Sequence, residues 1–551
     1  MRSGPLAPSS SERASARAEN VSSRLSYWAA ETPDRAALST SDGRELSYEA
    51  LDRKADALAH GLLELGLAPG DRASLFVRPG PELVALVHAC FRSGVVPVLL
   101  DPGMGRKALL GCIEKMQPRA LLGVPKAHVA RLLFPRAFRT VAITVTIGRR
   151  FPGTHASLLD LERTGAQRGR FSVRVPGGDA PAAILFTSGS TGPSKGVVHT
   201  HANFAAELEA LARLYALEPG EVDCACFPLF ALFDHALGMT SVFPPIDPSR
   251  PAACDPARVF TAIEENRATF TFGSPAIWQR LVPWMQSRVE RFTTLRRVTI
   301  AGASVPPRLV LALRELLPEG GEVHTPYGAT EALPVSNVTG AEIAELRQRI
   351  EGGEGTCVGR ALEDVELALL RITDDPIEAF SDELRVAPGE PGEVCVRGPS
   401  VAREYAFDPL ANRMAKIGAS PRPWHRMGDV GRLDADGRLW LLGRKSERIE
   451  TASGTLFPLP LENVYDTLSG VRRSALVGTG PRGSELPTLV VEPEPGSDLA
   501  ALERKLRAHR RDLADASRVT AIRFHPGFPV DVRHNAKIRR DELARWAQGR
   551  R

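Results

Sequence analysis

The sequence predicts an α/β protein with a large N-terminal domain of parallel-rich sheets and helices, a small β-rich part, and a small α+β C-terminal domain. Three observations carry this prediction. Helix-like and strand-like segments alternate through about residue 300, short strands and turns replace them after about residue 390, and the last hundred residues mix both kinds. A length of 551 residues exceeds what one hydrophobic core sustains, so we expect two or more domains.

The alternating segments come first. Apolar residues recur at helical spacing over 46–65, a strand follows over 72–77, then a helix over 82–92 and a strand over 95–100. This alternation indicates a parallel sheet covered by helices. Further strands are expected at 120–124, 183–186, 269–272 and 297–300.

The later segments are shorter. Strands are expected at 392–397 and within 432–441, where the pair Asp436-Gly437 is a strong hairpin signal. The last hundred residues predict a helix from Pro460, strands at 474–478, 488–491 and 519–524, a helix over 498–514, and a loop that carries Lys537.

Composition narrows the class of protein. With 43% hydrophobic and 25% charged residues and a net charge of +5, the chain is typical of a soluble globular protein and gives no sign of nucleic-acid binding. No stretch approaches 18 uninterrupted apolar residues, so we expect no transmembrane segment. The seven cysteines are odd in number and scattered, which favours a reduced, cytoplasmic protein without a zinc site. Residues 1–21, rich in Ser, Ala and Arg, are expected to be disordered.

The most informative stretch is 187–196, which holds five hydroxyl side chains, three glycines and one lysine between two strand-like runs. Glycines expose backbone N–H groups, while hydroxyls and a lysine bind phosphate oxygens, so the stretch predicts a nucleotide-phosphate loop. It matches neither the Walker pattern nor G-x-G-x-x-G. The alternative is a polar linker, which rarely separates two strands. The predicted phosphate-binding residues are Thr187, Ser188, Gly189, Ser190, Thr191, Gly192 and Lys195.

The order Thr-Ser-Gly-Ser-Thr-Gly-x-x-Lys-Gly resembles the phosphate loop of the acyl-adenylate-forming superfamily of acyl-CoA synthetases, adenylation domains and luciferases. Five further motifs follow in that superfamily's order, at 301–304, 325–331, 424–429, 443–448 and 531–537. Alone, several have ordinary explanations: 301–304 is equally a tight strand–helix turn, and Asp429 by itself is better explained as a turn residue. The resemblance covers about residues 22 to 548.

The resemblance assigns roles motif by motif. Adenine would lie against the two segments Gly302, Ala303, Ser304 and Tyr327, Gly328, Ala329. Thr330 would contact a phosphate, Glu331 would hold Mg²⁺, Asp429 would bind the ribose, and Arg444 would reach the ribose or a phosphate. Lys537 would stabilise the charge that develops as the carboxylate attacks the α-phosphate. Catalysis is thus expected from Lys537, Glu331 and Thr330, with ATP and Mg²⁺ as the cofactors.

This chain departs from the usual motifs at three positions. Met427 stands for a threonine, Ser446 for an Asp or Lys at the domain hinge, and Ala536 for a glycine before the catalytic lysine. The resemblance implies a large domain with a β-barrel-like part over 22–445 and a mobile small domain over 446–551 that carries Lys537. The residue at the hinge puts the usual domain rotation in question.

Four unusual motif variants, among them the stretch 227–242, are similar to the β-lactone synthetases of bacterial long-chain olefin biosynthesis. That resemblance implies a 2-alkyl-3-hydroxy acid, activated as its acyl-AMP and closed to a β-lactone by its own hydroxyl. It also implies assembly with neighbouring olefin-pathway enzymes. The rival readings are a long-chain acyl-CoA synthetase, which would need CoA, and a non-catalytic nucleotide-binding scaffold.

The expected acyl-binding residues include Phe230, Phe233, Asp234, His235 and Gly273, and either Asp234 or His235 is the expected base for the hydroxyl. Further apolar candidates for the alkyl pocket, each equally explained as ordinary core, are Phe227, Leu229, Phe272 and Trp278.

Overall fold

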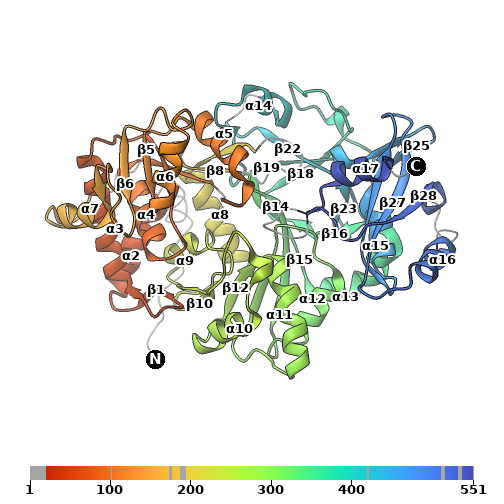
Figure 1. The fold of residues 1–551 in the computed structure, drawn as a ribbon, viewed down its shortest axis with the longest axis horizontal. Helices are drawn as coiled ribbons and strands as arrows, with labels where there is room; N and C mark the ends of the chain where they lie inside the picture. The colour runs from red at the N-terminus through yellow and green to blue at the C-terminus, as the bar shows by residue number, and fades with distance from the viewer. Residues whose placement is uncertain are drawn as a thin grey trace.

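The computed structural model describes residues 20–100, 102–172, 177–186, 194–418, 421–509, 515–530 and 537–549. The chain forms two large sheets, a smaller antiparallel sheet and a C-terminal α+β unit (Figure 1). This architecture confirms the predicted fold class.

An eight-stranded sheet has the order β20-β9-β8-β4-β3-β5-β6-β7, and all its strands except β20 come from the first 200 residues. The strands from β8 through β7 pair in parallel, and β9 pairs in antiparallel fashion with β8 and with β20. The strands are β3 (Arg72–Phe76), β4 (Val96–Leu99), β5 (Ala120–Gly123), β6 (Ile143–Thr146), β7 (Ala156–Ser157), β8 (Pro181–Phe186), β9 (Gly196–Thr200) and β20 (Glu404–Tyr405). The predicted strands at 72–77, 95–100, 120–124 and 183–186 are all present.

A nine-stranded sheet has the order β17-β15-β14-β13-β12-β10-β11-β1-β2. It is parallel from β1 through β14 and antiparallel at both edges. Its strands are β1 (Ala36–Thr40), β2 (Glu45–Ser47), β10 (Val222–Cys224), β11 (Thr240–Phe243), β12 (Phe270–Gly273), β13 (Arg297–Ile300), β14 (Glu322–Ala329), β15 (Ala332–Thr339) and β17 (Arg360–Ala361).

Helices connect and cover these strands, because each parallel pairing needs a crossover. Those of the two large sheets are α2 (Val21–Glu31), α3 (Tyr48–Glu64), α4 (Pro81–Ser93), α5 (Arg106–Met116), α6 (Pro125–Leu133), α7 (Leu158–Ala166), α8 (His201–Leu214), α9 (Ala231–Leu237), α10 (Pro256–Glu265), α11 (Pro275–Arg288), α12 (Pro307–Arg314) and α13 (Gly340–Arg349).

The structure of residues 20 and 21 differs from the prediction. Asn20 is buried and caps α2: its side chain accepts a hydrogen bond from the Ser22 N–H at 3.0 Å and donates to the Phe91 carbonyl at 2.6 Å. Residues 20 and 21 therefore belong to the fold, contrary to the expectation of disorder up to residue 21, because a capped helix end satisfies its free N–H groups. The rest of that expectation falls on residues outside the described ones.

One ion cluster fixes the first three helices. The fully buried Arg92 of α4 pairs with Asp52 at 2.5 Å and with Asp56, both on α3, and donates to Ser22 of α2 at 2.9 Å. A buried guanidinium is tolerated only where several acceptors surround it, as here.

The predicted β-rich part is an antiparallel sheet in the order β16-β23-β22-β19-β18, with β21 paired to β22. Its strands and the nearby helix are β16 (Thr356–Cys357), β18 (Glu366–Leu370), β19 (Gly392–Arg397), β21 (Lys416–Ile417), β22 (Trp424–Leu433), β23 (Leu439–Arg444) and α14 (Pro409–Ala415). The Asp436-Gly437 turn joins β22 to β23, as predicted, with Gly437 at φ 76°.

The C-terminal unit lies at one end of the molecule, blue in Figure 1. A hairpin of β24 (Ile449–Thr451) and β25 (Gly454–Leu456) precedes the sheet β26-β27-β28, and the unit has its own apolar core. The remaining elements are α15 (Pro458–Tyr465), β26 (Val471–Thr479), β27 (Leu486–Pro493), α16 (Leu499–His509), β28 (Ala521–Phe524) and α17 (Arg540–Gln548). Over the described residues, no helix combines the length and apolarity needed to cross a bilayer.

Candidate functional site

A cavity of about 2550 Å³ lies where the two large sheets, the antiparallel sheet and the C-terminal unit meet. Residues from motifs far apart in the sequence line it, from Lys195 to Lys537. Binding sites commonly form at the carboxyl ends of parallel strands, because neighbouring parallel strands end at the same edge of their sheet.

Both of the expected adenine-binding segments line this cavity. Gly302, Ala303 and Ser304 connect β13 to α12, and Gly302 has φ 96°, where only glycine is unstrained. Tyr327, Gly328 and Ala329 end β14. A Cβ on Gly328 would lie 2.6 Å from the Ala332 carbonyl oxygen, so the hairpin that follows needs glycine there.

Three expected residues meet across neighbouring strands. The Tyr327 hydroxyl donates to Asp429 Oδ2 at 2.7 Å, and Arg444 Nη1 donates to Asp429 Oδ1 at 2.9 Å. The antiparallel register of β22 and β23 places Asp429 directly opposite Arg444. Burial and the adjacent Asp429 carboxylate raise the pKa of Tyr327, which therefore stays a hydroxyl donor. Asp429 is thus fixed in position at the cavity wall.

Thr330 and Glu331 form the turn between β14 and β15 and also line the cavity. Tyr405 of β20 donates its hydroxyl to Glu331 Oε1 at 2.6 Å. The Ala402 N–H donates to the Glu331 carbonyl at 2.8 Å, so the segment before β20 is tied to the same turn. These contacts orient the carboxylate of Glu331.

Two lysines flank the ring of Tyr405. Lys195 Nζ lies 5.0 Å and Lys416 Nζ 5.6 Å from its centroid. Burial lowers the pKa of Lys416 to about 7, opposed by the attraction of Glu331. This cluster supplies positive charge at the turn that holds Thr330 and Glu331.

The phosphate-loop prediction falls only partly on described residues. Lys195 precedes β9 and lines the cavity. The other six predicted loop residues, Thr187, Ser188, Gly189, Ser190, Thr191 and Gly192, lie outside the described residues. The loop therefore stays a prediction at those positions.

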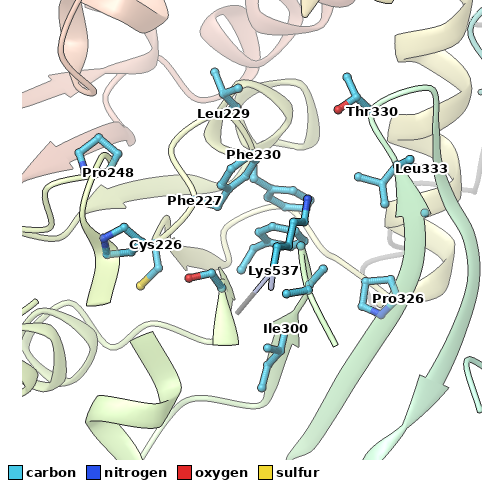
Figure 2. Close-up of a pocket in the computed structure, with 18 of the residues that line it drawn as sticks. Cys226, Phe227, Leu229, Phe230, Pro248, Ile300, Pro326, Thr330, Leu333 and Lys537 are labelled. Atoms are coloured by element: carbon cyan, nitrogen blue, oxygen red, sulfur yellow. The ribbon is translucent and has the colours of Figure 1, made fainter. Parts of the chain in front are cut away.

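Lys537 reaches the same cavity from the C-terminal unit. It directly precedes Ile538, which forms a bridge with Val530. Figure 2 shows Lys537 in the middle of the cavity, with Phe227 and Phe230 on one side and Pro326 and Leu333 on the other.

The apolar part of the wall contains most of the expected acyl-binding aromatics. The rings of Phe230 and Phe272 stack with centroids 5.0 Å apart, and Phe227 and Phe233 pack at their edges. Phe227, Leu229, Phe230, Phe233 and Phe272 all line the cavity. Face-to-edge and stacked rings keep this wall apolar.

Four expected residues are not brought to the cavity. Asp234 and His235 are fully buried on the opposite side of α9, where Asp234 accepts a hydrogen bond from Ser241 Oγ at 2.6 Å. Neither lines the cavity, so this geometry does not support the expectation that one of them deprotonates a substrate, which stays a prediction. Gly273 packs against Trp278 Nε1, and the Trp278 side chain is fully buried in the core, so neither residue lines the cavity.

Several residues at the site could not be found from the motifs. Tyr405, His199 and Glu207 line the cavity and Lys416 lies beside Tyr405, yet none belongs to a quoted motif, and tertiary packing alone brings them together. The His199 ring stacks on Phe204 with centroids 5.0 Å apart, and burial lowers its pKa to about 4. The one sequence signal for these residues is weak: Lys416 and His199 are polar side chains within short strands that are otherwise largely apolar.

Comparison with known proteins fits this geometry. A model of the family described as AMP-binding enzyme matches residues 25–406. The olefin beta-lactone synthetase of Stenotrophomonas maltophilia (strain K279a) is 44% identical over 96% of this chain and 98% of its own length. That of Xanthomonas campestris pv. campestris is 42% identical over 97% and 98%.

Solved structures share the fold. The amide bond synthetase McbA from Marinactinospora thermotolerans superimposes with a TM-score of 0.78 at 24% identity, covering 96% of this chain and 99% of that one. ATP-bound MatB from Rhodopseudomonas palustris gives 0.78 at 22% identity over the same shares. With the family match over more than half its length and the motif residues gathered at one cavity, this chain belongs to the AMP-binding enzymes and is an ATP-dependent, AMP-forming synthetase.

Proposed function

We propose that this synthetase activates a long-chain β-hydroxy acid as its acyl-adenylate and closes it to a β-lactone, as one step of olefin biosynthesis. The observation that carries the proposal is identity of 42–44% over nearly the whole chain to two proteins named olefin beta-lactone synthetase. A cavity with an apolar aromatic wall on one side and a polar, charged turn on the other supports it.

The first step would be adenylation. A carboxylate oxygen of the acid attacks the α-phosphorus of ATP, and the bond to the leaving pyrophosphate breaks. Asp429, held by Tyr327 and Arg444, would accept the ribose hydroxyls. Lys537 would stand beside the attacking carboxylate and lower the energy of the transition state by its charge. Lys195 and the segment 187–192 would hold the leaving phosphates.

The expected Mg²⁺ fits the residues at the turn. Glu331 Oε1 is engaged by Tyr405, and Oε2 makes no hydrogen bond within the described residues and is available as a hard ligand. Among the described residues, no group of three or more His, Cys, Asp or Glu side chains is arranged to hold a metal by itself. A single carboxylate suits Mg²⁺ that arrives with the triphosphate, whose charge it would neutralise.

The second step would be ring closure. The β-hydroxyl oxygen attacks the acyl carbonyl carbon, and the bond from that carbon to the phosphate oxygen breaks, releasing AMP. The nucleophile is already part of the substrate, so no second molecule has to be ordered. The wall of Phe227, Phe230 and Phe272 would hold alkyl chains beside the reacting carbonyl.

We also propose that residues 446–551 form the small domain that presents Lys537. Ser446 lies in the short turn Lys445–Glu447, and its neighbours are anchored to the large part. Lys445 Nζ lies 3.0 Å from Glu393 Oε1, and Arg448 Nη2 lies 2.6 Å from Asp374 Oδ2. These two ion pairs would have to break if the small domain rotates.

The test is incubation with ATP, Mg²⁺ and a 2-alkyl-3-hydroxy acid, with and without CoA, followed by mass analysis. We expect β-lactone, AMP and pyrophosphate in both arms. A thioester formed only with CoA would instead establish a long-chain acyl-CoA synthetase. Pyrophosphate release from neither arm would overturn adenylation itself.

A further inference from the structure

Glu207 is a buried carboxyl in the cavity wall that the reaction above leaves without a role. It lies on α8, whose start is fixed by a capping box of Thr200 and Asn203, and Asn203 also donates to the Pro399 carbonyl at 2.8 Å. Glu207 is only 7% exposed and lines the cavity. Within the described residues its carboxyl makes no hydrogen bond or ion pair, so a partner for it would have to come from the cavity.

The surroundings of Glu207 are apolar. Phe204, one helical turn earlier and so on the same face of α8, packs against Phe233 at 5.8 Å between centroids, and Phe233 contacts Phe230 at 6.1 Å. All three rings line the cavity. Leaving a buried polar group unpaired costs about 1–3 kcal/mol, so such a group calls for a partner from the ligand.

A substrate made only of alkyl chain and carboxylate offers Glu207 no partner, because its carboxylate is engaged at the adenylation site. A β-hydroxy acid offers one further hydroxyl, two carbons from the carboxyl carbon. That hydroxyl is also the nucleophile of the ring closure. A carboxyl in an otherwise aromatic wall therefore fits a hydroxylated acid better than a plain fatty acid.

We propose that Glu207 is the catalytic base of ring closure. Its carboxylate would accept a hydrogen bond from the substrate's β-hydroxyl and take the hydroxyl proton as the hydroxyl oxygen attacks the acyl carbonyl. The inference rests on the proposed function. The O–H bond breaks and its proton passes to the Glu207 carboxylate, the new C–O bond closes the ring, and the bond from carbon to AMP breaks. The protonated Glu207 then releases its proton to water, so that no oxidant or further reactant is required.

The environment suits this task. Burial raises the pKa of Glu207 to about 8, and no charged side chain contributes to the shift. A carboxylate of higher pKa is a stronger base, and it still ionises near neutral pH.

Other titratable groups on the packed elements are differently engaged. On α8 itself, Glu209 lies 4.0 Å from Arg24 of α2, and burial lowers the pKa of His201 to about 4. On β9, His199 stacks on Phe204. On α9, Asp234 accepts from Ser241, away from the cavity.

The experiment compares Glu207→Gln and Glu207→Leu with wild type in single-turnover reactions with ATP, Mg²⁺ and a 2-alkyl-3-hydroxy acid. Pyrophosphate reports adenylation, and the acyl-adenylate and lactone are quantified separately by mass. Glu209→Gln on the same helix is the matched control. A general base typically contributes about 10²–10⁴-fold, so Glu207→Gln should slow conversion of adenylate to lactone at least 100-fold.

We expect pyrophosphate release by both Glu207 variants to stay within about twofold of wild type, so that acyl-adenylate accumulates. Glu207→Leu keeps the wall apolar and should show the same block. Lactone formed from the adenylate at the wild-type rate in either variant would overturn the inference, as would equal loss of both steps in both variants. A wild-type protein that releases pyrophosphate but forms no lactone would overturn the proposed function as well.

Discussion

The hydrogen bond from Tyr405 to Glu331 gives the sharpest prediction about the adenylation step. Tyr405→Phe removes one oxygen that lies 2.6 Å from Glu331 Oε1 and leaves the aromatic ring beside Lys195 and Lys416 in place. The change therefore tests the orientation of the Glu331 carboxylate and little else.

The expected magnitude follows from the kind of bond. A hydrogen bond to a charged group contributes about 1.5–3 kcal/mol, and about 1.4 kcal/mol corresponds to a tenfold change in rate. If that contribution is lost in the transition state, kcat/KM for pyrophosphate release falls about 10- to 100-fold. Loss of groups that orient a metal ligand typically has an effect of about this size.

The assay is pyrophosphate release with ATP, Mg²⁺ and the hydroxy acid, with thermal unfolding measured in parallel. Tyr48→Phe is the matched control, because it removes an equally short 2.6 Å hydrogen bond, to the Met239 carbonyl, from a buried tyrosine that does not line the cavity. It should lower stability by about 0.5–1.5 kcal/mol and leave adenylation unchanged. Wild-type adenylation by Tyr405→Phe would refute the role given to Tyr405.

Three further predictions concern the lysine, the core and pH. Lys537→Ala should abolish pyrophosphate release while ATP binding, measured calorimetrically, changes little, and normal turnover would contradict the role proposed for this lysine. Arg92→Met should lower the free energy of unfolding in urea by about 3–5 kcal/mol, because it removes the buried partner of two carboxylates and leaves them only the exposed Arg170. Arg53→Met at the exposed pair with Glu49 should change it by less than about 1 kcal/mol; equal effects would contradict this reading. The raised pKa of Glu207 means that the folded protein holds a proton that the unfolded chain releases near pH 4.5, so the stability of the wild type should decline as pH rises from about 4.5 to 8. Glu207→Gln should lack that part of the decline in thermal unfolding. A stability difference between the two proteins that does not change with pH would contradict this reading.

The fold was largely predictable because its signals are local. Alternating apolar runs gave β3, α4, β4 and β13 to within about a residue or two at each end, and the Asp436-Gly437 pair gave the hairpin of β22 and β23. The extent of the ordered N-terminus was not predictable from composition, because the Asn20 cap depends on a distant partner, the Phe91 carbonyl.

The site was predictable only where its residues belong to contiguous motifs. Tyr327, Asp429 and Arg444 come from three such motifs, and the sheets bring them within hydrogen-bonding distance. Asp234 follows Phe233 directly in the sequence, yet only Phe233 faces the cavity, since successive residues of a helix point about 100° apart.

Residues outside the motifs needed the structure. Tyr405 reaches Glu331 because the short strand β20 pairs with β9, a contact between segments some two hundred residues apart. In the sequence Glu207 is an ordinary glutamate within a helical pattern, and only the packing of α8 shows that it is buried in the cavity wall. No local periodicity distinguishes such a residue from a solvent-facing one.

In the proposed reaction the carboxylate is first joined to AMP, and AMP is then displaced by the substrate's own hydroxyl. The most direct test uses a 2-alkyl-3-hydroxy acid with ¹⁸O in both carboxylate oxygens, incubated with ATP and Mg²⁺ in the absence of CoA. We expect one ¹⁸O in the released AMP and the other in the carbonyl of a β-lactone. AMP without label, or no lactone until CoA is added, would contradict it.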